Sequence, residues 1–387
     1  MNPLLHLTET QGAILDTARA FCAAEIAPFA AQWDRDAHFD PTLVGKLGEL
    51  GFLGMMLPEA YDGLGLDAVT YLLALEEISA ADASVGVLMS VHNSLPSQLI
   101  LKFGTDAQKA EFLGPLARGE ILGAFALSEP DAGSDAASMR AQAVRDGDGW
   151  ILNGTKAWIS AGGHAGVILA MARTDTPDAR RGSKGIGAFI LTPDLPGFKV
   201  GKKENKMGLR ASETVQLVFD NMRVPGCRLL GDPAQGFAYA LQTLEHGRLG
   251  IAAQALGIAR AAFEHAAAYA AERQQFGRPI GEFQGIQFKL ADMATRINAA
   301  RSLIHATAAA KDRGLPVGEY ASMCKLFATE TAMWVTTQAI QVFGGYGYTT
   351  DYPVEKLFRD AKVTEIYEGT SEIQRIVIGR AALKGRG

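Results

Sequence analysis

The chain has 387 residues, of which 48% are hydrophobic and 20% charged, and its formal net charge is −5. This length allows two or three domains with a substantial core, and an acidic chain without a basic stripe is not expected to bind nucleic acid. Its three cysteines are far apart and lack metal-ligand spacing, so we predict neither a disulfide framework nor a metal site.

No apolar run approaches the roughly 18 residues of a membrane span, and the N-terminus lacks the pattern of a secretory signal. We therefore expect no membrane association. The expected compartment is the cytoplasm in a bacterium and the mitochondrial matrix otherwise.

The N-terminal third of the chain has a helical pattern. Thr8 and Gln11 fit a capping box, and apolar residues recur after them at helical spacing. Residues 58–65 form an interrupting loop, and helices are expected over Tyr71–Ile78 and Val85–Phe103.

The pattern changes at about Ile121 to short segments of β-forming residues separated by Gly, Pro, Asp and Asn. The dipeptide Asp148-Gly149 predicts a hairpin turn. Because the connections are too short for parallel crossovers, a mostly antiparallel sheet is expected. Its strands are predicted at Ile121–Leu127, Met139–Val144, Trp150–Ser160, Val167–Arg173, Ala188–Thr192 and Thr214–Asp220.

Beyond Pro233 the chain is helical again, and its first long helix carries Arg248 on an otherwise apolar stripe. A buried guanidinium needs acceptors, so Arg248 belongs either to a structural ion pair or to a ligand contact. Further helices are expected at about 283–312, 319–343, 353–363 and the end of the chain. The predicted fold class is α+β: a helical domain (1–120), a β domain (121–232) and a helix bundle (233–387).

The last helix follows the stretch Ile366–Arg375, in which Ser371 and Gln374 predict a capping box. Glu368 therefore lies just before the helix, beside Gly369. A carboxylate there either complements the helix dipole or acts at a backbone break where another molecule can approach closely.

The sequence lacks the motifs that would support several enzyme classes. The chain has no G-x-G-x-x-G opening a helix after a strand, no phosphate-binding P-loop, no G-x-S-x-G elbow and no H-E-x-x-H pair. Three glycine-punctuated polar stretches could instead hold a phosphate or a polar ring edge: residues 128–135, 158–160 and 343–348.

Five motifs occur in order along the chain: ALSEP at 126–130, KAWIS at 156–160, ERQQFG at 272–277, QVFGG at 341–345 and IYEGTSEIQR at 366–375. Together they resemble the acyl-CoA dehydrogenases, and the resemblance runs essentially from end to end. It implies the same order of helices, β domain and helix bundle. It also implies FAD-dependent oxidation of an acyl-CoA thioester to its trans-2-enoyl form, with electrons passed to electron-transfer flavoprotein.

The resemblance assigns Glu368 as the base that removes the α-proton of the substrate. It implies FAD contacts at Phe125, Leu127, Ser128, Gly133, Ser134, Trp158, Ile159, Ser160, Arg273, Gln275, Phe276, Gln284, Gln341, Gly344, Gly345, Thr370 and Glu372. It implies substrate contacts at Ser134, Glu245, Arg248, Gln254, Thr364 and Gly369. Because family members share each FAD site between subunits, a homo-oligomer, usually a homotetramer, is expected.

Two further matches bear on the catalytic base and on the length of the acyl chain. Some branches of the family carry their base at the position of Gly247, which cannot serve, so the resemblance leaves the role to Glu368. Gln254 and Thr364 match polar residues that shorten the acyl pocket in the short-chain branch, so a butyryl-like substrate is expected first.

Residues 161–164 and Asp131 depart from the family pattern and leave 2-methyl-branched and ring-bearing short acyl-CoAs open. An oxygen-using flavoenzyme and a non-catalytic scaffold remain as alternatives. For the pKa of Glu368, the helix N-terminus favours the anion and a dry acyl pocket favours the neutral acid.

Overall fold

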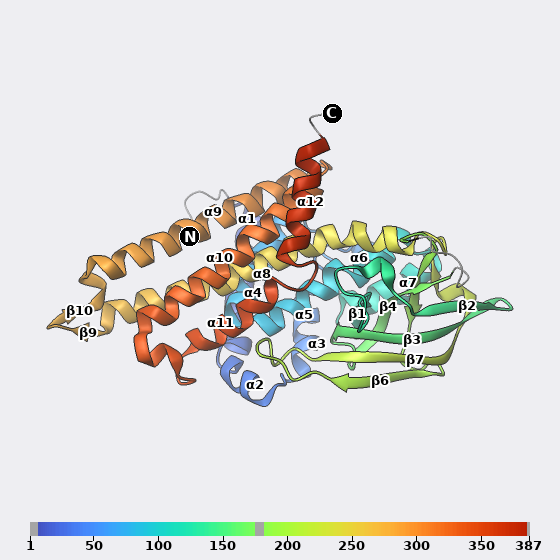
Figure 1. The fold of residues 1–387 in the computed structure, drawn as a ribbon, viewed down its shortest axis with the longest axis horizontal. Coiled ribbons are helices and arrows are strands. Elements are labelled where there is room, and N and C mark those ends of the chain that lie inside the picture. Colours follow the sequence, from blue (N-terminus) through green and yellow to red (C-terminus); the bar gives the residue numbers. More distant parts are fainter. Residues whose placement is uncertain (1–6, 175–181, 385–387) are drawn as a thin grey trace.

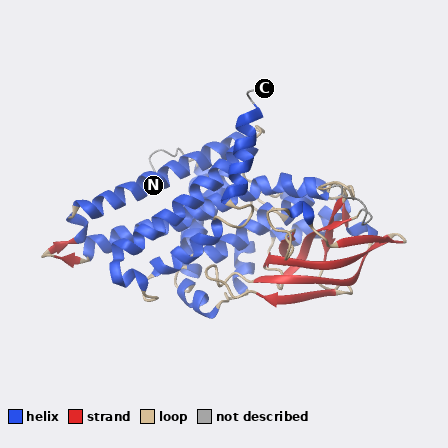
Figure 2. Ribbon diagram, in the orientation of Figure 1, coloured by secondary structure: helices blue, strands red, loops and turns tan. Residues whose placement is uncertain are grey.

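The structure, a computed structural model that describes residues 7–174 and 182–384, places a large helical body beside a β sheet (Figures 1 and 2). Helices precede and follow the strands in the chain, so the predicted fold class is confirmed. Helices that precede the strands pack against helices that follow them, and the sheet lies at one end of the molecule. The limits of the three predicted domains stay a prediction, and their outer ends fall outside the described residues.

The first helices begin as the sequence predicts, because Thr8 Oγ1 accepts from the Gln11 backbone N–H at 3.2 Å and completes the capping box of α1. The single helix predicted over Val85–Phe103 is wrong. It is divided at Leu95, because Pro96 lacks an N–H and therefore begins a new helix. The bounds are α1 Glu9–Phe21, α2 Ala30–Asp36, α3 Thr42–Glu49, α4 Ala68–Ala81, α5 Ala83–Ser94, α6 Pro96–Phe103 and α7 Asp106–Ala117, with a π-helical turn at Cys22–Ile26.

The strands are β1 Leu122–Ala126, β2 Gln142–Asp146, β3 Gly149–Ser160, β4 Ala165–Arg173, β5 Ile186–Leu191, β6 Phe198–Lys203, β7 Thr214–Val224 and β8 Leu229–Leu230. They form one sheet in the order β6-β7-β3-β2-β4-β5-β8, and β1 pairs with β4. The sheet is mostly antiparallel, as predicted, although β1 and β2 both pair with β4 in parallel.

Two local predictions in the sheet are corrected. Asp146 pairs with Gly149, so the hairpin turn is Gly147-Asp148, one residue before the predicted dipeptide, and Gly147 takes the positive φ of 59°. Sequence reasoning missed β6 because it is an edge strand rich in lysine and mostly exposed, which leaves no clear alternation of apolar residues.

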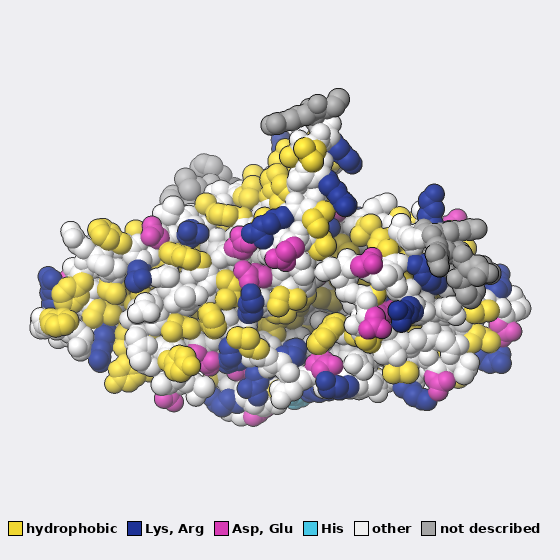
Figure 3. Space-filling view, viewed as in Figure 1, with side chains coloured by type: hydrophobic (Ala, Val, Ile, Leu, Met, Phe, Trp, Pro, Cys, Tyr) yellow, Lys and Arg dark blue, Asp and Glu magenta, His cyan; other side chains and the backbone are white. Residues whose placement is uncertain are grey.

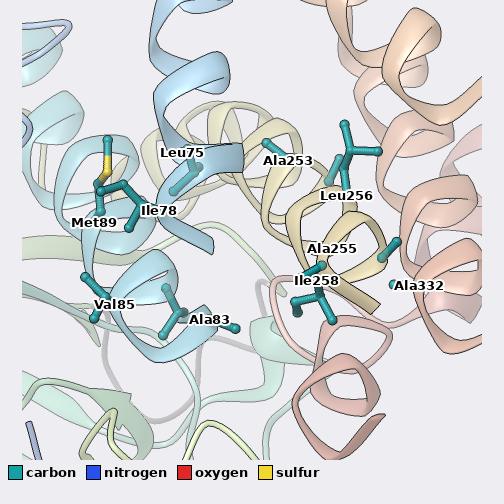
Figure 4. Close-up of a cluster of buried hydrophobic side chains, with 14 of the residues drawn as sticks. Leu75, Ile78, Ala83, Val85, Met89, Ala253, Ala255, Leu256, Ile258 and Ala332 are labelled. Atoms are coloured by element: carbon teal, nitrogen blue, oxygen red, sulfur yellow. The ribbon is translucent and has the colours of Figure 1, made fainter. Parts of the chain in front are cut away.

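The later helices are α8 Gly236–Glu272, α9 Gln284–Asp312, α10 Gly318–Phe343, α11 Pro353–Thr364 and α12 Ser371–Lys384, with the short hairpin strands β9 Gln274–Gln275 and β10 Arg278–Pro279. The middle of α8 is rich in alanine and glycine, which lets neighbouring helices approach closely. A Cβ at Gly257 would overlap the α4 backbone at Glu76. Figure 4 shows buried side chains of α4, α5 and α8 in this core, among them Leu75 and Leu256.

The sheet is attached to the helices through the loop between β6 and β7. The Leu209 backbone N–H donates to Asp360 Oδ1 of α11 at 2.6 Å. The Lys356 ammonium joins Asp360, at 2.7 Å, to Asp82 between α4 and α5, at 2.9 Å. Both carboxylates are buried. These contacts fix the sheet, and the loops at the ends of its strands, against the helices that hold Glu368.

Candidate active site

Glu368 lies in a tight turn between α11 and α12. Thr370 Oγ1 accepts from the Ile373 backbone N–H at 3.3 Å, so Thr370 caps α12 and the predicted cap at Ser371 is wrong by one residue. Glu368 and Gly369 have φ values of 49° and 92°. A positive φ is uncommon for a residue with a side chain, and such strained conformations cluster at functional sites.

The carboxylate of Glu368 is buried, and neither of its oxygens has a hydrogen-bond partner among the described residues. Burial raises its pKa from 4.5 to about 7, against the opposing charges of Lys325 and Arg248. A carboxylate that only complements the helix dipole would lie in water. A pKa near neutrality in a dry site suits a group that takes up a proton.

Two residues of α8 lie against this carboxylate. A Cβ on Gly247 would overlap Glu368 Oε2, so only glycine leaves room for the acid in this position. Arg248 Nη1 donates to Ser322 Oγ of α10 at 3.2 Å, and its buried Nε has no partner in the described chain. None of the ion pairs among the described residues involves Arg248. The geometry therefore favours the ligand-contact alternative over the structural ion pair.

Sequence reasoning missed two other neighbours of Glu368. Burial raises the pKa of Tyr71 on α4, the Ser90 hydroxyl opposes that rise, and the charge of Glu368 adds to it. Lys325 of α10 is fully buried, and its charge lowers the pKa of Glu368. Tyr71 looks like any core aromatic. Lys325, like Arg248, is a charged residue among apolar helix positions, and this sequence pattern could have identified it as a candidate site residue.

The residues expected to shorten the acyl pocket are buried and bound to the protein itself. Gln254 Nε2 donates to the Ala83 carbonyl at 2.8 Å, and the Tyr367 hydroxyl donates to Gln254 Oε1. Thr364 Oγ1 donates to the Ala361 carbonyl at 2.6 Å, within α11. These bonds hold α5, α8 and the turn before Glu368 together. Of the other substrate candidates, Glu245 lies against Gly318 at the start of α10, and Ser134 is exposed in the loop after β1.

The residues expected at the flavin ring lie at the ends of β1 and β3. Trp158 has a φ of 63° and is 63% exposed, an unusual exposure for so large an apolar face. Beside it, the Ser128 carbonyl accepts from the Ala157 N–H at 2.9 Å. Lys156 is fully buried and donates to Glu129 at 2.8 Å, which ties the two strand ends together. The other members of this group are Phe125, Leu127, Gly133, Ser134, Ile159 and Ser160.

The residues expected at the pyrophosphate and adenosine lie mostly around one cavity of about 590 Å³, between the β9–β10 hairpin and the end of α10. Among its lining residues are Arg273, Gln275, Phe276, Gly344 and Gly345. Gln284 begins α9 and Gln341 lies in the last turn of α10, both beside this cavity and exposed; Thr370 and Glu372 lie instead at the start of α12.

The cavity supplies the groups that a diphosphate with a flat ring requires, namely a guanidinium, exposed backbone and aromatic faces. The Arg273 guanidinium lies 5.3 Å from the centre of the Tyr346 ring, and Phe276 is 95% exposed. The hairpin beside the cavity lies at one end of the molecule and the sheet at the other (Figure 1). One chain therefore does not bring the two groups of expected FAD contacts into one site.

The surface view shows a hollow near the middle of this face, between the helical body and the sheet (Figure 3). Within the described residues, no group of three or more His, Cys, Asp or Glu side chains could hold a metal ion. None of the helices in the same residues is both long and apolar enough to cross a membrane.

Three family models match the chain: the N-terminal domain of acyl-CoA dehydrogenase over residues 8–120, the middle domain over 124–222 and the C-terminal domain over 234–383. The mouse mitochondrial short-chain specific acyl-CoA dehydrogenase is 49% identical over 380 residues, which are 98% of this chain and 92% of the relative.

Two solved structures are also very similar. Butyryl-CoA dehydrogenase from Megasphaera elsdenii has a TM-score of 0.95 and 45% identity, over 98% of this chain and 99% of that chain. A chain of the structure named "Electron transferring flavoprotein of Acidaminococcus fermentans: Towards a mechanism of flavin-based electron bifurcation" has a TM-score of 0.96 and 47% identity, with the same coverage.

Proposed function

This chain belongs to the acyl-CoA dehydrogenase family, and we propose that it oxidises short-chain acyl-CoA thioesters to trans-2-enoyl-CoA and passes the electrons to an electron-transfer flavoprotein. Members of the family are FAD-dependent oxidoreductases of fatty acid β-oxidation and are typically homotetramers. The chain is accordingly an acyl-CoA dehydrogenase that uses FAD. The acyl chain, the electron acceptor and the roles of single residues are the parts proposed.

The observation that carries the proposal is the buried carboxylate of Glu368, which has a pKa of about 7 and no hydrogen-bond partner among the described residues. In the proposed reaction it takes the α-proton of the thioester, and the glycine at position 247 leaves space for it. Arg248 holds the thioester arm of the substrate through guanidinium donors such as Nε, which has no partner among the described residues, while Nη1 donates to Ser322. The surrounding helices exclude water, which strengthens each of these interactions.

The chain's residues fit FAD. Trp158 offers an exposed aromatic face for the flavin ring, and Ser128 lies beside it. Arg273 and Gly344, at the 590 Å³ cavity, suit the pyrophosphate, because a guanidinium neutralises its charge and glycine allows close approach. When bound, FAD supplies the acceptor for the hydride that leaves the β-carbon. Because these two regions lie at different ends of one chain, we propose that each FAD is held by two copies of the protein.

A short acyl chain is supported by the bonds around Gln254. Its amide is tied to Ala83 and to Tyr367, which hold this polar side chain in place, and we propose that it closes the end of the acyl pocket. The similarity to a short-chain specific enzyme and to butyryl-CoA dehydrogenase points to the same substrate class. The structure named for an electron transferring flavoprotein supports the proposed acceptor. We place the protein in the cytoplasm of a bacterium or in a mitochondrial matrix.

The test is anaerobic reduction of the purified flavoprotein by a panel of straight, 2-methyl-branched and longer acyl-CoAs, read as loss of the flavin absorbance. We expect butyryl-CoA to reduce the flavin at the highest kcat/KM. Faster reduction by a branched or longer acyl-CoA would contradict the short-chain assignment. Rapid reoxidation by air with peroxide formation would contradict the proposed acceptor.

A further inference from the structure

Lys325 is a fully buried lysine whose ammonium is directed at the backbone beside Glu368. It comes from the first half of α10, and its Nζ donates to the Gly369 carbonyl at 2.6 Å. The side-chain amide of Gln374 donates to the same carbonyl at 2.8 Å and reaches the Glu368 carbonyl at 3.4 Å. A buried ammonium is costly unless it is paired, so this contact requires an explanation.

The contact holds the turn in its strained form. Glu368 and Gly369 both have positive φ, with values of 49° and 92°, and such a turn persists only where surrounding groups fix it. Two donors from different helices, Lys325 of α10 and Gln374 of α12, meet at one carbonyl of the turn. A charged donor forms the stronger of two such bonds. Lys325 is thus the charged one of the two described side-chain donors that hold this carbonyl beside Glu368.

The ammonium also acts on the charge of Glu368. Its positive charge is the largest influence that lowers the pKa of Glu368 against burial, ahead of Arg248. Burial in turn lowers the pKa of Lys325 to about 8, with the charge of Glu368 opposing, so Lys325 is still protonated at neutral pH. The titratable groups that act on this pair are Arg248 of α8, Tyr71 of α4, and Tyr367, Glu365 and Glu372 of the segment that contains Glu368.

We propose that Lys325 is the positioning residue of the catalytic base: it holds the Gly369 carbonyl to orient Glu368, and its positive charge favours the ionised form of that carboxylate. This inference rests on the proposed function, in which Glu368 takes the α-proton. Among the described residues, Lys325 donates to the backbone of the turn, and neither Lys325 nor any other residue donates to the Glu368 carboxylate.

The test compares Lys325→Met, which removes both donor and charge, Lys325→Gln, which keeps a donor without the charge, and Lys325→Arg, which keeps the charge. Each holoenzyme is reduced anaerobically by butyryl-CoA between pH 5.5 and 9. We expect the midpoint of the pH profile to rise by about one unit in the Met and Gln variants, as for loss of a nearby opposite charge. It should stay within about 0.3 unit of the parent in Lys325→Arg, whose charge is retained.

Loss of the hydrogen bond from Lys325 to the Gly369 carbonyl should have an effect on the rate that is separate from the loss of charge. At pH 9, where Glu368 is ionised in every variant, Lys325→Met should still reduce its flavin at least about tenfold more slowly than the parent, and Lys325→Gln should recover part of that loss. Lys289→Met is the matched control, because Lys289 bonds Gln338 of α10 at 2.6 Å away from the turn and should leave the profile unchanged.

Unchanged midpoints in both the Met and Gln variants would overturn the inference. If Lys325→Met does not retain flavin, the midpoints of Lys325→Gln and Lys325→Arg test the inference. An unchanged midpoint in Lys325→Gln would then overturn it. Failure of the proposed function is recognised separately, because Glu368→Gln would then reduce its flavin at the parent rate.

Discussion

Replacing Glu368 with glutamine keeps the size of the side chain and removes its ionisation, so the change should affect activity and stability in opposite directions. We expect flavin reduction by butyryl-CoA to fall by about 100- to 10,000-fold, the usual effect of losing a general base. The folded protein should become more stable at alkaline pH, because burial makes the ionised carboxylate unfavourable.

The size of the stability gain follows from the pKa of Glu368, which burial raises from 4.5 to about 7. Below pH 4.5 the carboxyl is protonated in the folded and unfolded states alike, and it contributes no difference in stability. Between pH 4.5 and 7 the unfolded chain releases its proton while the folded chain retains it, so the folded state loses stability until the cost is complete above pH 7. At about 1.4 kcal/mol per pKa unit, that cost reaches about 3 kcal/mol.

Thermal unfolding of the holoenzyme at pH 5 and pH 9, followed by circular dichroism, measures this difference. For 387 residues, an unfolding entropy of about 2.1 cal/mol/K per residue converts 3 kcal/mol into a rise in Tm of about 4 °C at pH 9, and of about 1 °C at pH 5. Glu59→Gln is the control, since Glu59 is exposed and should give no rise at either pH. An equal rise at both pH values, or none at pH 9, would refute the assigned burial and pKa.

Gly247→Ala should slow flavin reduction by butyryl-CoA at least about tenfold while FAD content stays at the parent level, because the new Cβ overlaps the Glu368 carboxylate and must displace it. Gly12→Ala, where a Cβ meets no atom of the described residues within 4 Å, is the control; a parent rate for Gly247→Ala would contradict the geometry. Arg273→Met should raise the fraction of FAD released on dilution about tenfold, measured by flavin fluorescence, because the proposed charged contact to the pyrophosphate would be lost. Arg278→Met, in the same hairpin, should not, and equal release from both variants would remove Arg273 from the site.

The order of helices, strands and helices could be read from the sequence, because periodicities of 3.6 and 2 residues record which faces are buried. The predicted helix and strand bounds were wrong where two neighbouring residues carry the same signal or where the signal is weak. Pro96 divides a helix whose apolar pattern continues across it, and β6 is an exposed edge strand with little pattern to read. At the last helix, adjacent hydroxyl residues compete for the cap, and Thr370 takes it instead of Ser371.

The sequence by itself determined the family, the candidate base and the residues expected around FAD, since these depend on short motifs whose order along the chain is preserved. Only the tertiary structure decided the environment of Glu368. Lys325 lies 44 positions before the carbonyl that it holds, and Tyr71 approaches the base from a helix in the N-terminal third of the chain. The pKa of a carboxyl group depends on its depth and on charges brought near it by folding, and neither is a property of local sequence.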